Sequence, residues 1–207
     1  MASPSTTEHR SAPATALAVV LLVFFSTSGH DQPSQLEQVQ QRGSLTILTR
    51  NGASTYYIGP DGATGPEVEL ARQFSNFLGV GLNIEPAETF SALAGMLENG
   101  QGDLIAANLS RTPQREQRFN FGPDYQETRM LAVYRRGDQR PRGMDDLVGR
   151  KIMVIAESSY QEALETAAAE LPGLEWEVRH DVGMEELLLA VSDGAIDVTL
   201  VDSNIFS

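Results

Sequence analysis

The sequence contains no cysteine, one tryptophan and three histidines among its 207 residues. Without cysteine, the chain has no disulfide framework, no thiolate metal site, no cysteine nucleophile and no sulfur for lipid attachment. Basic residues are also scarce, since 15 lysines and arginines face 28 acidic residues, for a net charge of −13. General nucleic-acid binding needs a basic surface, and anionic lipid repels an acidic one. We therefore expect no nucleic-acid partner and no electrostatic docking on lipid.

Motifs for metal, cofactor or catalytic chemistry are missing as well. His180 is the one histidine after residue 30, and a single histidine beside Asp181 is weak evidence for a metal site. The sequence has no phosphate-binding glycine loop, no dinucleotide fingerprint and no nucleophile elbow. Glu67 and Glu69 are two residues apart, so a helix points them in different directions and they make a poor acid–base pair. We expect no metal, no cofactor and no catalytic residue in this chain.

The N-terminus has the pattern of an export signal. His9 and Arg10 precede an apolar run of 12 residues, 14–25, and small residues follow it. A bilayer span takes roughly 20 residues, so we expect a signal peptide over residues 1–30, with an uncleaved N-terminal anchor as the alternative. An exported chain without cysteine suits a bacterial periplasm. Residues 31–43, rich in Gln and Ser, are expected to form a short linker or a first turn.

Strand and helix patterns alternate along the rest of the chain, which predicts an α/β fold with parallel sheets. Apolar runs predict strands at Leu45–Leu48, Leu82–Ile84, Asp103–Asn108, Arg129–Arg135, Lys151–Ile155, Leu174–Val178 and Asp197–Val201. Helical spacing predicts helices at Pro66–Leu78, Phe90–Leu97, Pro113–Arg118, Ser159–Leu171 and Met184–Val191. Ser159 followed by Glu162 has the spacing of a capping box. The polar stretch Arg136–Gly143 marks a boundary, which gives a first lobe at 44–135 and a second at 136–207.

The two halves repeat one pattern at an offset of 94 residues. The corresponding residues are Gly100 and Gly194, Asp103 and Asp197, and Asn108 and Asp202. Each set spans the end of a helix, then a tight turn, then an apolar strand, and last a polar residue at the strand's carboxyl end. Two similar lobes explain this pattern, and chance similarity of two ordinary units is the alternative. Because ligands of open α/β sheets bind beyond the carboxyl ends of the strands, residues 108–110 and Asp202 are expected to face one cleft.

Three stretches resemble a known family. They are "RGSLTILTRNGASTYYIGPDGATGPEVELARQFSNFLGVGL", "FGPDYQETRMLAVYRRGDQRPRGMDDLVGRKIMVIAESS" and "LPGLEWEVRHDVGMEELLLAVSDGAIDVTLVDSN". The first resembles the start of the family-3 solute-binding proteins. Together, from about Leu36 to the last residue, they resemble the N-terminal domain of the lytic murein transglycosylase F family. The resemblance implies a bilobed, type II periplasmic-binding-protein fold, incomplete at its C-terminus. A lysozyme-like catalytic domain, expected to be absent from this chain, follows in the family.

The resemblance also implies which residues bind a ligand. Arg115 matches the arginine that holds a ligand carboxylate, for which a planar guanidinium gives a bidentate pair, and Asp202 matches the acid that holds the ammonium. The remaining matches are Asn108 and Ser110 as hydrogen-bonding positions, Ser158 and Ser159 at a helix N-terminus suited to anions, and Tyr56 or Tyr57 as an aromatic that packs on the ligand.

Each of these residues also has a plainer structural explanation. Arg115 would belong to a solvated helix face, Ser159 would be a helix cap, and Asp202 would be a cap or turn residue. Tyr56 and Tyr57 would belong to the core or to the rim of a lobe.

The resemblance implies an exported regulatory domain that binds an amino acid or a peptidoglycan peptide in its cleft. Peptidoglycan itself would be the partner of the absent catalytic domain, and the full-length protein would lie in the periplasm at the outer membrane. A free amino-acid-binding protein that serves an importer is one alternative. A small periplasmic enzyme on the same fold, such as a dehydratase, is another, and it requires an acid–base pair that we do not find in the sequence.

Overall fold

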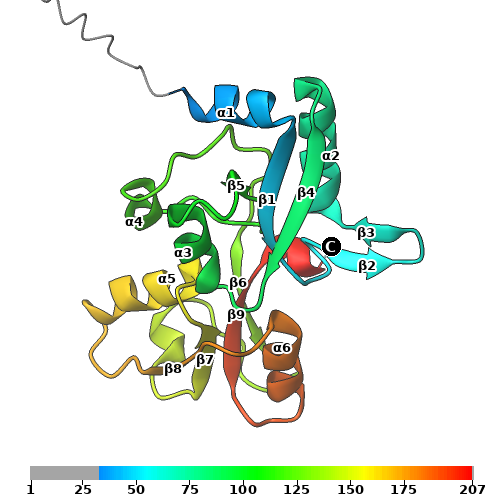
Figure 1. Ribbon diagram of the computed structural model, residues 1–207. Coiled ribbons are helices and arrows are strands. Elements are labelled where there is room, and N and C mark those ends of the chain that lie inside the picture. Colours follow the sequence, from blue (N-terminus) through cyan, green and yellow to red (C-terminus); the bar gives the residue numbers. More distant parts are fainter. Residues whose placement is uncertain (1–32, 207) are drawn as a thin grey trace, which may run out of the picture. The chain divides into compact units, whose positions relative to one another are not determined.

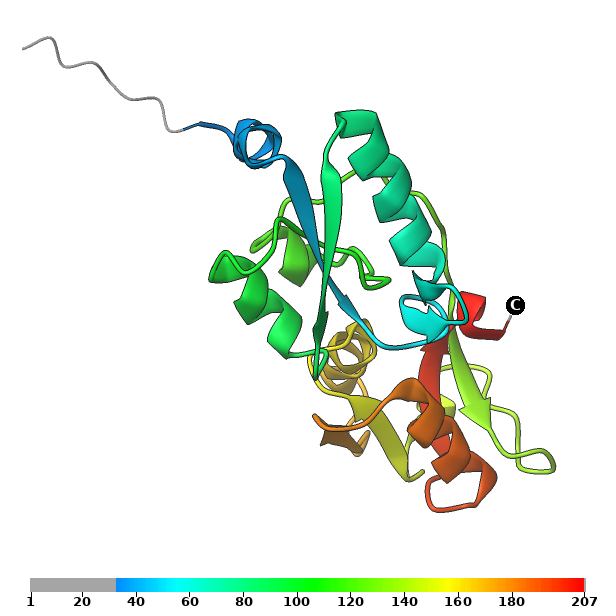
Figure 2. The same cartoon turned by 45° about the vertical axis from the view of Figure 1, so that its right-hand side comes forward.

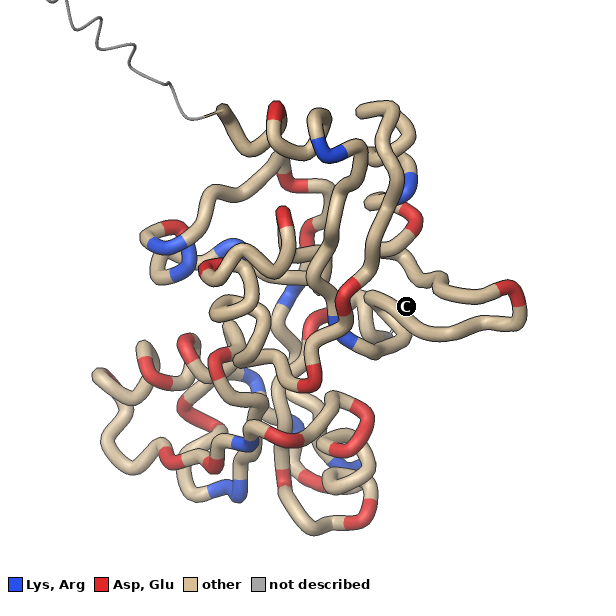
Figure 3. The backbone as a smooth tube through the Cα atoms, viewed as in Figure 1, with Lys and Arg blue, Asp and Glu red and all other residues tan. Residues whose placement is uncertain are grey.

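The computed structural model describes residues 33–206, and the expected signal peptide lies outside this range. Two main sheets, one with three strands and one with four, form the centres of two lobes (Figure 1). We call these the first and the second lobe in chain order. None of the helices within residues 33–206 is long and apolar enough to cross a membrane. Acidic residues are spread over both lobes (Figure 3).

The first lobe is built on a parallel sheet in the order β4-β1-β5. Its strands are β1 (Ser44–Arg50), β4 (Gly81–Ala87) and β5 (Leu104–Ile105). Its helices are α1 (Gln35–Arg42), α2 (Pro66–Leu78), α3 (Ala92–Glu98) and α4 (Pro113–Glu116). A hairpin of β2 (Tyr57–Gly59) and β3 (Gly62–Thr64) precedes α2.

Strand β1 is buried on both faces, which explains its nearly continuous apolar sequence. Leu45 and Ile47 pack with α1 and α2, whereas Leu48 packs with α3 on the opposite face (Figure 2). Pro66 at the first turn and Gly79 in the left-handed conformation set the bounds of α2, as its sequence predicts.

Residues 31–43 differ from the expected linker, because most of them form helix α1. The side chain of Ser34 accepts from the backbone N–H of Glu37, and Glu37 bonds back to the N–H of Ser34. This capping box starts the helix, and Gly43 ends it. Only Val39 is buried, so the helix has little of the apolar periodicity by which helices are predicted.

The second lobe is built on a sheet in the order β6-β9-β7-β8, in which only β6 is antiparallel to its neighbour. Its strands are β6 (Met130–Tyr134), β7 (Ile152–Ile155), β8 (Trp176–Arg179) and β9 (Val198–Asp202). Helices α5 (Ser159–Ala168) and α6 (Met184–Ser192) flank the sheet (Figure 1), and two short 3-10 turns lie at η1 (Asp145–Leu147) and η2 (Ser203–Phe206).

The expected boundary after residue 135 assigns β6 to the first lobe, and the strand pairing corrects this. Met130 pairs with Asp202 and Tyr134 with Val198, so β6 belongs to the sheet of the second lobe. The change of sheet therefore comes before Met130. The polar stretch at 136–143 is a loop between β6 and η1, and its composition alone does not distinguish a loop from a linker between lobes.

The repeat at an offset of 94 residues is confirmed by its hydrogen bonds. Asp103 Oδ2 accepts from the backbone N–H of Thr46 at 2.7 Å, just inside the start of β1. Asp197 Oδ2 accepts in the same way from Lys151 at 2.8 Å, just before β7. The glycines that precede them, Gly100 and Gly194, are both left-handed, with φ of 68° and 73°. Each lobe thus has an aspartate that fixes the amino end of a central strand.

Candidate functional site

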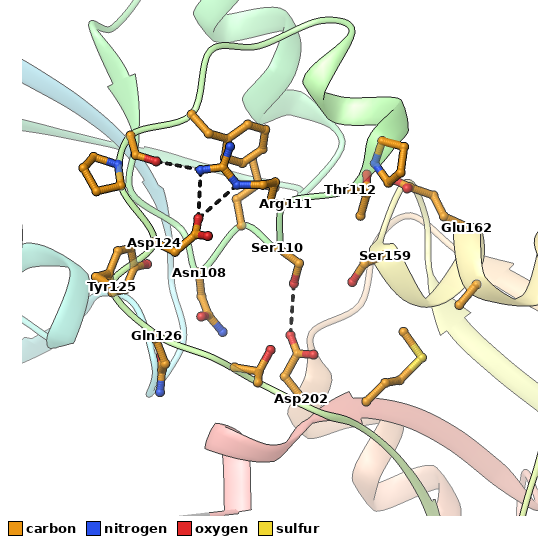
Figure 4. A pocket seen from close by; sticks show the side chains of 18 of the residues that line it. Asn108, Ser110, Arg111, Thr112, Asp124, Tyr125, Gln126, Ser159, Glu162 and Asp202 are labelled. Carbon is orange, nitrogen blue, oxygen red and sulfur yellow. Dashed lines mark hydrogen bonds and ion pairs between the residues drawn. The ribbon is translucent and has the colours of Figure 1, made fainter.

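A cavity of about 430 Å³ lies where the carboxyl ends of β1 and β5 meet those of β7 and β9. We call it the cleft cavity. A second cavity of about 550 Å³, the side cavity, adjoins it (Figure 4). The two share five lining residues: Asn108, Ser110, Gln126, Ser159 and Asp202. The convergence of residues 108–110 and Asp202 on one cleft, expected from the repeat, is therefore observed.

Asp202 is the last residue of β9 and is 6% exposed. The hydroxyl of Ser110, on the first lobe, donates to the Asp202 carboxylate at 3.5 Å (Figure 4). The backbone N–H of Asp202 donates to the Tyr160 hydroxyl at 3.0 Å. Burial raises the pKa of Asp202, and the hydrogen bonds oppose this shift only in part. Within residues 33–206 no cation forms an ion pair with it, so the site suits an ammonium group brought by a ligand.

Arg115 is positioned by the short helix α4, which Thr112 caps and Pro113 begins. Its guanidinium is nearly buried and makes three polar contacts with other residues. Nη1 donates to the Ser110 carbonyl at 2.8 Å, Nη2 donates to the Glu157 carbonyl at 2.9 Å, and Nε lies 3.4 Å from Glu162 Oε1. Two of these partners belong to the second lobe. Arg115 therefore joins the lobes, and it is not the solvated helix residue that its neighbours in the sequence suggest.

Two residues without glycine's freedom adopt left-handed backbone conformations beside this contact. Asn108 has a φ of 53° and Glu157 a φ of 56°. The Asn108 N–H donates to Glu67 Oε1 at 3.0 Å, and its side-chain oxygen accepts from Asn204 at 3.2 Å. Such conformations cost energy and gather at functional sites. Here they lie on the two lobes where Arg115 connects them.

Glu67, in the first turn of α2, is a buried carboxyl beneath this part of the cleft. Besides the Asn108 N–H, it accepts a short hydrogen bond from the Tyr125 hydroxyl. Burial raises the pKa of Glu67, and both hydrogen bonds counteract the shift.

The cap of α5 is one residue earlier than the sequence suggested. Ser158 is the N-cap, with its hydroxyl accepting from the Gln161 N–H at 3.3 Å and donating to the Ile155 carbonyl at 2.6 Å. Ser159 is the first helical residue, and it lines both cavities (Figure 4). The expected cap role of Ser159 is therefore wrong, because Ser158 has the extended backbone that a cap requires.

The two tyrosines proposed to pack on the ligand do not line either cavity. Tyr57 lies on strand β2 of the hairpin and is 43% exposed. Tyr56 forms backbone bridges with Asn51 and Gly52 in the turn before the hairpin. Tyr57 thus belongs to the hairpin, whereas Tyr56 lies beside Asn51 and Gly52, two residues that do line the cleft cavity.

Sequence reasoning missed Arg50 and Phe90, which both line the cleft cavity. The Phe90 ring centroid lies 5.5 Å from the Arg115 guanidinium carbon, a cation–π distance. Arg50 ends β1, so the rule that ligands bind at carboxyl strand ends could have selected it. Within residues 33–206 no cluster of three potential metal-ligating side chains occurs.

Comparison with known proteins finds relatives that are longer than this chain. A membrane-bound lytic murein transglycosylase F of Ectopseudomonas mendocina is 42% identical over 190 residues, which are 91% of this chain and 39% of the relative. A protein of the same name from Saccharophagus degradans is 38% identical over 174 residues, 84% of this chain and 35% of the relative. The chain thus spans less than two fifths of the length of these relatives.

Solved structures show the same fold at low sequence identity. An ancestral arginine-binding protein bound to arginine has a TM-score of 0.71 at 22% identity, covering 80% of this chain and 72% of its own. The arginine-bound form of truncated ArgBP from T. maritima has a TM-score of 0.69 at 24% identity, covering 82% and 78%. The predicted bilobed α/β fold is confirmed.

The resemblance to the N-terminal part of transglycosylase F is likewise confirmed. The sequence profile of one family, described as bacterial extracellular solute-binding proteins, family 3, matches residues 45–170. Since this match covers more than half of the chain, the chain belongs to the bacterial extracellular solute-binding proteins, family 3.

Proposed function

We propose that this chain is the ligand-binding, regulatory domain of an exported lytic murein transglycosylase F-like protein. It would bind an amino acid or a peptide released from peptidoglycan in the cleft cavity. The observation that supports this most strongly is the buried carboxylate of Asp202, which forms no ion pair with the described residues 33–206 and lies where both lobes meet. Its relatives carry the transglycosylase name, which suggests the cell-wall source of the ligand.

Different residues around the cleft would bind different groups of the ligand. Asp202 and Ser110 would receive the ammonium group, and Ser159 lies at the N-terminal turn of α5, where the helix dipole favours a carboxylate. Arg115 would contact that carboxylate once the ligand displaces Glu162 from its Nε. Phe90, stacked near the guanidinium, would cover one side of the ligand.

Ligand binding would stabilise closure of the lobes, because Arg115 and Asp202 each make a polar contact across the cleft. A ligand shifts such an equilibrium only by its differential affinity for the two states. We propose that closure alters the activity of a glycan-cleaving domain in the part of the protein that this chain does not span. The location would be the periplasm, at the periphery of the outer membrane.

Isothermal titration calorimetry tests this function on the full 207-residue chain. The titrants are free L-amino acids and soluble stem peptides of peptidoglycan. At least one titrant should bind, and Asp202→Asn should weaken it by roughly tenfold or more, because a charge-assisted contact to the ammonium is lost. Asp181→Asn, an exposed aspartate paired with Arg179, is the matched control and should change nothing. Failure of every titrant to bind the folded chain would refute the proposal.

A freestanding amino-acid-binding protein of an importer is the second candidate. It is suggested by solved structures of this fold that are named as arginine-binding proteins. The same titrations discriminate the two candidates. Free amino acids should bind more tightly than stem peptides to an importer component, and the reverse order supports the cell-wall sensor.

A further inference from the structure

Arg50 is the arginine of the cleft that forms no ion pair with the described residues 33–206. It is the last residue of β1, it is half-buried, and it lines the cleft cavity. Its Nη2 donates to the Val182 carbonyl of the second lobe at 2.9 Å. This is the one hydrogen bond of its guanidinium to the described residues, and it forms no ion pair with any of them. A guanidinium has five donors, so four remain for another partner.

The other two arginines that line the cavities are paired with acidic residues. Arg111 bonds to Asp124 (Figure 4), and it also bonds to Glu116 and the Gly122 carbonyl and stacks on Phe121. Arg115 is held by two carbonyls and Glu162, as described above. Arg50 differs from both because it has no acidic partner among the described residues.

One acidic residue of the cleft cavity lies near Arg50. It is Glu185, in the first turn of α6. Glu185 Oε2 and Arg50 Nη2 both lie near Gly183, since a Cβ on Gly183 would lie 3.1 Å from the first atom and 4.0 Å from the second. Glu185 is exposed and makes no ion pair with Arg50. A half-buried cation without a partner is unfavourable, and an anionic group in the cavity would relieve this cost.

We infer that Arg50 binds an acidic group of the ligand. This inference rests on the proposed function and narrows it: the ligand carries a second carboxylate beyond the ammonium and carboxylate of an amino acid. The class is therefore a dicarboxylic amino acid, or a short peptide that contains one. Because Arg50 also holds the Val182 carbonyl, its contact with the ligand would reinforce lobe closure.

Pairs of titrants that differ in one carboxylate test the inference without needing a variant. L-glutamate is compared with L-glutamine, and L-alanyl-γ-D-glutamate with its α-amide, by calorimetry on the full chain. The acid of at least one pair should bind about tenfold or more tightly than its amide, as expected for a charge-assisted hydrogen bond. Arg50→Gln should abolish this preference, and Arg50→Lys should retain part of it. Arg72→Gln, which removes an exposed arginine of α2, is the control.

The outcomes separate the two proposals. If the wild-type chain binds the amide as tightly as the acid in every pair that it binds, the inference fails while the ligand-binding function stands. The inference also fails if Arg50→Gln keeps the preference with an unchanged melting temperature. If no member of either pair binds, and the wider panel of amino acids and stem peptides also fails, the proposed function fails as well. Loss of the preference in Arg50→Gln, with the control unchanged, supports the inference.

Discussion

Replacement of Glu162 by glutamine should tighten ligand binding, because Glu162 is paired with the guanidinium of Arg115, to which we propose that the ligand's carboxylate binds. Glu162 Oε1 lies 3.4 Å from Arg115 Nε, and the two side chains are 19% and 8% exposed. At this distance and an effective dielectric constant near 20, the Coulomb attraction is about 5 kcal/mol. Desolvation of both groups offsets most of it, so the net contribution of such a pair is about 1 kcal/mol. A neutral amide at position 162 removes that competition.

The expected gain is therefore about fivefold in affinity for the tightest-binding titrant. Calorimetry of wild type and Glu162→Gln measures it, with Glu165→Gln as control. Glu165 lies one turn further along α5 and accepts from Gln161 at 2.8 Å, so its removal changes the net charge equally without touching Arg115. Equal or weaker binding by Glu162→Gln would show that the ligand does not compete for Arg115. A matching gain in Glu165→Gln would assign the effect to overall charge.

Three further predictions concern stability, and each is checked by urea unfolding. Asp103→Ala and Asp197→Ala should each lower the free energy of unfolding by about 2 kcal/mol, because a strand N–H loses its acceptor, and the Asn variants, which keep an oxygen, should lose less. Burial raises the pKa of Glu67 above its ordinary 4.5, so the folded chain holds this proton more tightly than the unfolded chain. Stability from this group should fall as pH rises from about the ordinary pKa through the raised one, and Glu67→Gln should flatten that slope, whereas an unchanged slope would contradict the assignment. Gly65→Ala should cost about 3 kcal/mol, because its Cβ would clash with the Thr55 carbonyl oxygen at a φ of 129°, whereas Gly62→Ala meets no atom within 4 Å and should cost clearly less.

Much of the fold could be predicted because its signals are local. Pro66 and Gly79 set the bounds of α2, and the repeated glycine and aspartate pattern placed Asn108 and Asp202 at equivalent strand ends. Two sheets of this kind place such ends at one cleft, so the position of Asp202 follows from topology. The family resemblance added Arg115. Its burial in the cleft could not be predicted locally, because the surrounding sequence is polar and charged.

Some of the errors arise because a structural feature depends on contacts between residues distant in sequence. The partner of β6 is β9, some 70 residues later, and no local pattern reveals this antiparallel pairing. Tyr56 and Tyr57 do not line either cavity, and Tyr57 instead pairs with Thr64 in the β2–β3 hairpin. Helix α1 is an exception, because its Ser34–Glu37 capping box was present in the sequence and could have been recognised.

Asp103 and Asp197 lie at one end of the central strands, whereas the cleft lies at the other. Asn108 is five positions after Asp103, and Asp202 is five positions after Asp197, a span of roughly 16 Å in an extended chain. The aspartates that secure each lobe are therefore physically apart from the residues that line the cleft. This separation makes the chain a suitable scaffold for redesign, in which new specificities are selected at the cleft while both aspartate anchors stay fixed.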